Sequence, residues 1–177
     1  MVRIEPVYDG KRRFYDLLLQ ADEQPEMIGR YLDRGEMFVM FGEWDNVLSD
    51  TVRHSGVDVV GSDADGNGLS QTVTVAVAVV TDEGGGVCEL KNLAVDERYR
   101  RCGYGRRMLE FLFDRYRGRF ERMLVGTGEA PTALLFYEHC GFIRSHRVEN
   151  FFTDNYDHPI IEAGVRLKDM IYLQKEI

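Results

Sequence analysis

Apolar residues recur along the chain with two spacings, one typical of strands and one typical of helices. Continuous or alternating β-branched and apolar runs predict strands, whereas apolar residues three or four positions apart predict helices. The predicted strands cover 2–7, 37–41, 73–80, 87–95, 122–126, 142–148 and 170–175. The predicted helices are a pair within 14–32, one through Met108 and Tyr116 that ends at Gly118, and one over 132–140. This order predicts an α/β (α+β) domain with a mixed sheet.

Glycine-rich and polar stretches divide these elements. The run Gly84–Gly86 predicts a turn that joins two long strands into a hairpin in the middle of the chain. Residues 45–71 are rich in Asp, Ser, Gly and Asn and predict a long polar insertion. At 177 residues the chain fits a single domain, 1–177, that buries about two-thirds of its unfolded surface.

The composition narrows the class of protein. Hydrophobic residues make up 44% of the chain and charged residues 29%, which is typical of a globular protein and excludes a disordered or fibrous one. No apolar run approaches the length of a membrane span, and the first residues lack the apolar stretch of a signal peptide. Cys88, Cys102 and Cys140 are odd in number and widely spaced, which excludes a disulfide or zinc framework. We therefore expect a cytoplasmic protein without membrane or metal.

The net charge of −8 is unevenly distributed. An acidic chain disfavours nucleic acid as a partner, because phosphate backbones select basic surfaces, and it favours cationic small molecules. Between Asp96 and Arg122, however, nine arginines stand against five acidic residues. This local excess is consistent with an anion-binding segment or with the solvated charges of a helix.

A basic loop with two glycines joins the strand that ends at Val95 to the next helix. Glycines let the backbone approach a ligand closely, and the amides and dipole at the helix N-terminus favour an anion such as phosphate. A dinucleotide fold would need a third glycine where Met108 stands, and it would place the motif after the first strand. A phosphate-loop NTPase would need Gly-Lys-Ser or Gly-Lys-Thr, which the loop lacks.

The stretch Arg100-Arg-Cys-Gly103-Tyr-Gly105 resembles the Arg-x-x-Gly-x-Gly signature of the GNAT superfamily of acetyl-CoA-dependent N-acetyltransferases. The strand segment Leu93–Val95 before it and the segment 133–142, with Tyr137-Glu-x-x-Gly-Phe, are similar to the flanking motifs of that superfamily. The resemblance covers most of residues 36–175. It implies a mixed, mostly antiparallel central sheet flanked by helices, with a splayed strand pair at the cofactor site.

The resemblance also implies how acetyl-CoA would bind. Backbone groups of three strand residues would bond the pantetheine arm, and the loop after them would hold the pyrophosphate through amides and arginine side chains. The implied binding residues are Leu93, Ala94, Val95, Arg100, Arg101, Cys102, Gly103, Tyr104, Gly105 and Arg106. No metal is expected, and acetyl transfer would be direct, without a cysteine nucleophile.

Amine acetylation needs a base and an acid, because the amine must be neutral to attack and the leaving thiolate needs a proton. Tyr137 stands where many members of the superfamily keep the acid, although an aromatic residue on a helix also fits a packing role. Glu89 lies fourteen residues before Gly103, the spacing at which histone acetyltransferases of the superfamily place their base. An ordinary ion pair or a base relayed by water remains an alternative for Glu89.

The acceptor is predicted only as a class. We expect acetyl transfer to a primary amine of a small molecule or peptide, drawn as an ammonium to carboxylates such as Asp154, Asp157 and Glu162. His158 in the same segment fits substrate contact and loop packing equally. The alternative function is a catalytically silent acyl-CoA-binding or sensing module, which would keep the phosphate loop without needing Tyr137. Oligomeric state is left open, a homodimer included.

Overall fold

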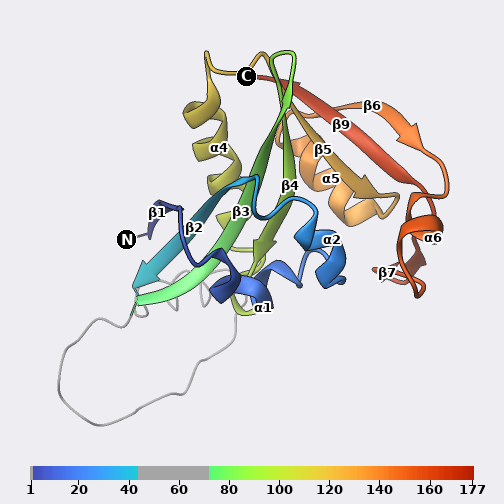
Figure 1. The fold of residues 1–177 in the computed structure, drawn as a ribbon, viewed down its shortest axis with the longest axis horizontal. Helices are drawn as coiled ribbons and strands as arrows, with labels where there is room; N and C mark the ends of the chain where they lie inside the picture. The colour runs from blue at the N-terminus through green and yellow to red at the C-terminus, as the bar shows by residue number, and fades with distance from the viewer. Residues whose placement is uncertain (1, 44–71) are drawn as a thin grey trace, which may run out of the picture.

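The computed structural model describes residues 2–43 and 72–177, and Figure 1 shows the fold. Its strands are β1 (Val2–Val7), β2 (Glu36–Glu43), β3 (Thr72–Gly84), β4 (Val87–Val95), β5 (Arg122–Gly128), β6 (Ile143–Val148), β7 (Ile161–Glu162), β8 (Val165–Arg166) and β9 (Met170–Glu176). Its helices are α1 (Tyr15–Leu18), α2 (Pro25–Gly29), α4 (Tyr104–Tyr116), α5 (Pro131–His139) and α6 (Phe151–Asn155). The predicted polar insertion at 45–71 lies outside the described residues.

Seven strands form one sheet in the order β1-β2-β3-β4-β5-β9-β6. All neighbouring strands in this sheet are antiparallel except β4 and β5, which are parallel and are connected by α4. The predicted mixed, mostly antiparallel sheet is therefore confirmed. In Figure 1 β4 and β5 lie in the middle of the fold, and α6 and β7 lie near the start of β9.

Each face of the sheet is covered by its own helices. Successive residues of β2 alternate between two cores: Phe38 and Met40 pack with α4, whereas Met37 and Val39 pack with α1 and α2. This is the alternation expected of a strand that is buried on both faces. A third, smaller cluster joins Ala130, at the start of α5, to the C-terminal segment through Phe152, Ile160 and Leu167. The sheet is thus held on both sides, and the small cluster supports the segment between β6 and β9.

The start of β2 packs so closely that a glycine is required there. A Cβ on Gly35 would lie 2.5 Å from Val79 Cγ1 and 3.0 Å from the Tyr31 carbonyl oxygen. We expect Gly35→Ala to lower the free energy of unfolding by about 1–3 kcal/mol through overpacking. Gly29→Ala is the matched control, because a Cβ there meets nothing within 4 Å. Urea denaturation should show that Gly29→Ala leaves the free energy of unfolding unchanged or raises it by up to about 1 kcal/mol. Equal losses of unfolding free energy in both variants would contradict the packing argument.

None of the helices within residues 2–43 and 72–177 is long and apolar enough to cross a membrane.

Candidate active site

The parallel strands β4 and β5 separate partway along their length. Their pairing runs from Val87 opposite Arg122 to Leu90 opposite Val125 and then stops. Beyond that point β4 continues to Val95 against β3, and β5 continues to Gly128 against β9. The two strands therefore open into a V, and the predicted splayed strand pair is confirmed.

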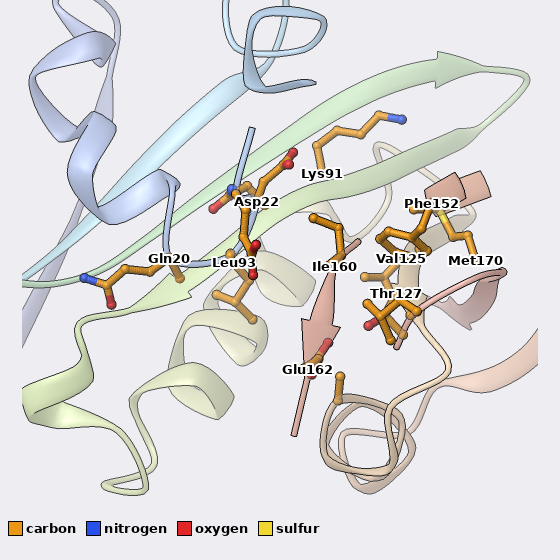
Figure 2. A pocket seen from close by; sticks show the side chains of 18 of the residues that line it. Gln20, Asp22, Lys91, Leu93, Val125, Thr127, Phe152, Ile160, Glu162 and Met170 are labelled. Atoms are coloured by element: carbon orange, nitrogen blue, oxygen red, sulfur yellow. The ribbon is translucent and has the colours of Figure 1, made fainter. Parts of the chain in front are cut away.

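A cleft of about 390 Å³ occupies this V. Its walls come from β4, β5, α5, the segment between α1 and α2, and the segment between β6 and β9. Figure 2 shows Gln20, Asp22 and Leu93 on one side and Val125, Thr127, Phe152 and Met170 on the other. The cleft thus brings together segments from almost the whole length of the chain.

Strand geometry directs backbone hydrogen-bonding groups of β4 into the cleft. The Asp96 amide donates to Val75 of β3 at 2.9 Å, so the backbone of Asp96, and of Ala94 two residues earlier, faces β3. The backbone hydrogen-bonding groups of the alternate residues, Leu93 and Val95, then point away from β3, toward the side from which β5 has separated. Arg100 confirms this direction, because its Nε donates to the Val95 carbonyl oxygen at 3.1 Å. Backbone groups of Leu93 and Val95 are therefore placed to bond a ligand that enters the V.

The loop 100–106 begins at the end of β4 and leads into α4. Arg101 and Gly103 both have left-handed backbone conformations, with φ of 65° and 83°. No side chain within residues 2–43 and 72–177 caps the N-terminus of α4, and the amides of Gly105 and Arg106 fall in its first turn, where no helix carbonyl precedes them. A Cβ on Gly105 would lie 3.2 Å from Phe136 Cζ, so this glycine allows α4 to approach α5. The loop and the start of α4 therefore have the backbone features that the sequence predicts for an anion site, namely a glycine turn and an uncapped helix N-terminus.

The arginines of this loop have different partners. Arg100 lines the cleft and reaches Gln20 Oε1 at 3.0 Å as well as Val95. Arg101 is exposed. Arg106 turns the other way and donates to the His139 carbonyl oxygen at the end of α5, at 3.3 Å. Of the three arginines predicted as countercharges, Arg100 is therefore the one that lines the cleft. Cys102, which follows Arg101 in the loop, is partly buried.

Tyr137 projects from α5 into the wall of the cleft. Its ring packs edge-on against Phe136 and Phe142, with centroids 5.1 and 5.6 Å away. Within the described parts of the chain its hydroxyl makes no hydrogen bond. Burial, and then the nearby charge of Glu162, raise the pKa of the phenol above its ordinary value. The hydroxyl therefore remains protonated at neutral pH and is free to donate a proton into the cleft.

Glu89 does not line the cleft. The residue is 8% exposed, and its carboxylate is held by Lys91 Nζ at 2.6 Å and by the Tyr172 hydroxyl at 3.3 Å. The sheet explains this placement, because Glu89 lies opposite Leu124 in the part of β4 that still pairs with β5, before the two strands separate. Lys91, rather than Glu89, reaches the cleft wall.

Of the three acidic residues predicted near the acceptor, one lines the cleft and two lie outside it. Glu162 lines the cleft, and burial followed by the charge of Glu23 raises its pKa. Asp154 and Asp157 are exposed and stand outside it. His158 is also outside the cleft and bonds Asp157, which raises the pKa of the imidazole.

Two cleft carboxylates, Asp22 and Glu23, were not predicted from the sequence. They lie between α1 and α2, far along the chain from the signature loop, and a pair of acids in a polar turn gives no functional signal by itself. With Glu162 they add three carboxylates to a cleft that Arg100 and Lys91 also line. The cleft therefore offers both a cation that suits a phosphate and carboxylates that suit an amine.

Comparison with known proteins agrees with this geometry. Residues 64–144 match the family model described as "Acetyltransferase (GNAT) domain". A Bacillus subtilis protein named "Uncharacterized N-acetyltransferase YvbK" is 25% identical, covering 99% of this chain and 97% of the relative. The crystal structure of a GNAT family acetyltransferase from Elizabethkingia anophelis with acetyl-CoA bound has a TM-score of 0.76 at 28% identity, covering 99% of this chain and 98% of that one. A Bacillus subtilis acetyltransferase in complex with CoA shares the fold, with a TM-score of 0.75 at 24% identity, covering 100% and 99%.

Proposed function

The chain belongs to the GNAT family of N-acetyltransferases, and from that premise we propose that it transfers the acetyl group of acetyl-CoA to a primary amine by direct attack. The observation that carries this proposal is the V between β4 and β5, whose cleft is lined by Arg100 of the basic loop 100–106 and by the carboxylates of Asp22, Glu23 and Glu162. Tyr137 stands in the wall of the same cleft. The acceptor is a small molecule or a peptide.

The residues present fit acetyl-CoA. We assign the pantetheine arm to the backbone groups of Leu93 and Val95, and the pyrophosphate to the first-turn amides of α4. Arg100 is the cleft-lining countercharge, and a diphosphate needs one, because an unpaired buried charge costs several kcal/mol. Acetyl-CoA supplies the activated acetyl group as a thioester, and the protein supplies orientation and proton transfer.

Direct attack forms one bond and breaks one bond at the thioester carbonyl carbon. The neutral amine nitrogen forms a bond to the thioester carbonyl carbon, and an outward-facing amide of β4 can stabilise the oxyanion that develops. The carbon–sulfur bond then breaks, and the Tyr137 hydroxyl gives its proton to the leaving thiolate. The phenol is protonated at neutral pH, so it has a proton to give when the thiolate forms. The attacking nitrogen loses its second proton as the amide forms, and that proton restores the tyrosine hydroxyl.

The attacking amine must first lose a proton. We place this step at Glu162, which lines the cleft and whose raised pKa makes it a stronger base than an exposed glutamate. The pKa of Tyr137 responds to the charge of Glu162, so the two groups interact across the cleft. Glu89 is not part of this proposal, since it does not line the cleft and its carboxylate is already paired with Lys91.

A panel of amines tests the proposed function. We expect acetyl-CoA to release its free thiol faster with at least one acceptor among a polyamine, an aminoglycoside, an amino acid, a peptide N-terminus and 2-phenylethylamine than without an amine. Mass spectrometry should show the matching N-acetylated product. Tight acetyl-CoA binding with no turnover for any of them would favour the alternative, a catalytically silent acyl-CoA-binding module.

A further inference from the structure

Asp22 is held in the cleft by residues from two distant segments. Its Oδ2 accepts a hydrogen bond from the Tyr31 hydroxyl at 3.3 Å, and its Oδ1 accepts one from the Tyr156 hydroxyl at 3.0 Å. The Gln24 backbone amide also bonds this carboxylate. These donors fix the position of Asp22 and leave its remaining lone pairs available, since a carboxylate offers about four acceptor sites.

The charge of this carboxylate is not balanced by a close cation. No lysine, arginine or histidine nitrogen lies within 4 Å of it in residues 2–43 and 72–177, whereas Glu89 has Lys91 at 2.6 Å. Burial raises the pKa of Asp22, and the two tyrosine hydrogen bonds and, more weakly, the charge of Arg30 oppose that rise. A desolvated carboxylate without a close counterion is costly, and a bound cation would offset that cost.

A second acceptor atom near Asp22 also lacks a donor. Asn92 of β4 lines the cleft and is 3% exposed. Its Nδ2 donates to the Leu18 carbonyl oxygen and to the Tyr31 hydroxyl, both at 3.0 Å, and the same hydroxyl donates to Asp22. Asn92 Oδ1 is buried and has no hydrogen-bond partner among the described residues. A primary ammonium, which carries three donors and no acceptor, matches this pair of acceptors.

An apolar surface begins beside the same carboxylate. The Tyr156 ring stacks on Phe152, with centroids 5.4 Å apart and planes 28° apart. Phe152, Ile160 and Leu167 are all less than 9% exposed, and all three line the cleft. Figure 2 shows Ile160 between Asp22 and the group formed by Phe152 and Met170. The wall next to Asp22 therefore suits a hydrocarbon or aromatic body rather than a polar one.

We propose that Asp22 and Asn92 bind the ammonium group of an amphipathic primary amine, whose apolar body packs against Phe152 and Ile160. This inference rests on the proposed function, because it names the class of acceptor for the same cleft. It makes Asp22 the residue that selects a cationic acceptor. It also favours an arylalkyl or alkyl amine over an amino acid, whose carboxylate would be repelled by Asp22, Glu23 and Glu162.

The test measures binding to the CoA-loaded protein by calorimetry, with 2-phenylethylamine as the probe. The wild type should bind this amine about tenfold or more tightly than the uncharged 2-phenylethanol, because charge-assisted hydrogen bonds are lost in the alcohol. It should also bind 2-phenylethylamine about tenfold or more tightly than methylamine, which lacks the apolar body. Asp22→Asn should remove the preference for the amine over the alcohol.

Asp154→Asn is the matched control, because this aspartate is exposed and lies outside the cleft. It should keep the wild-type preference. Equal wild-type affinity for the amine and the alcohol would overturn the proposal without needing any variant to fold, and so would the same loss in both variants. Acetylation of other amines would then still support the proposed function. If instead the amine binds as expected but neither it nor any other amine of the panel is acetylated, the binding site stands and the proposed function fails.

Discussion

Gly103→Glu should weaken acetyl-CoA binding by about a hundredfold or more, because a like charge would face the pyrophosphate and the backbone would be strained. Gly103 precedes the first turn of α4 and has a φ of 83°, which L residues rarely adopt. A Cβ there meets nothing within 4 Å, so the side chain has room and the expected loss comes from charge and backbone conformation. Calorimetric titration with acetyl-CoA measures the change.

Gly84→Glu separates these two causes. Gly84 also has a positive φ, 78°, and open space around its Cβ position, but it lies at the end of β3 in the turn to β4. The backbone strain is therefore similar, whereas the added carboxylate is far along the chain from the loop 100–106. We expect acetyl-CoA affinity close to that of the wild type. Equal affinity of Gly103→Glu and wild type would refute the assignment of this loop to the pyrophosphate.

The central part of the fold could be predicted from the sequence because it consists of long, regular elements. The strand 87–95 has the predicted bounds, and the helix through Met108 and Tyr116 is α4. The predicted helix pair within 14–32 is present only as the short helices α1 and α2. Turns continue the apolar face beyond α1, with Gln20 and Ala21 amides bonded three residues back. Apolar periodicity reports which side faces the core, and it does not distinguish a helix from such turns.

The segment from Glu149 to Leu167 lies between two predicted strands and has no predicted element of its own. In the structure it contains α6 and the two-residue strands β7 and β8. Elements this short have too few residues to show a period, and their stability comes from tertiary contacts such as those of Phe152 and Ile160. Sequence periodicity therefore could not place Glu162 on the cleft wall.

The candidate site also contains residues that local motifs predict and residues that only tertiary contacts bring together. The loop 100–106 and Tyr137 belong to local motifs, so their neighbourhood followed from the sequence. Asp22 and Asn92 meet through Tyr31, across segments that sequence spacing does not relate. The face of the sheet on which the Glu89 side chain lies depends on the register shift at Lys91, because one extra residue in a strand reverses the face of the residues before it. Strict alternation would put Glu89 on the same face as Leu93, whereas the shift puts it on the opposite face.

Tyr137→Phe should lower kcat by about a hundredfold, because it removes a general acid while keeping the aromatic ring. The ring contacts with Phe136 and Phe142 remain in the variant. Since the hydroxyl makes no hydrogen bond within the described ranges, its removal should leave Tm and the Kd for acetyl-CoA unchanged. Steady-state turnover with the best amine of the panel, measured beside acetyl-CoA titration, gives both quantities.

Tyr99→Phe is the matched control for the loss of a tyrosine hydroxyl. The Tyr99 hydroxyl is buried, has no hydrogen-bond partner in the described part of the chain, and does not line the cleft. Its removal should therefore leave kcat at the wild-type value. Because the pKa of Tyr137 is raised, the wild type should also show no loss of kcat from phenol ionisation near neutral pH. A Tyr137→Phe variant with unchanged kcat would make Tyr137 a packing residue of α5, and the thiolate would have to take its proton from another group.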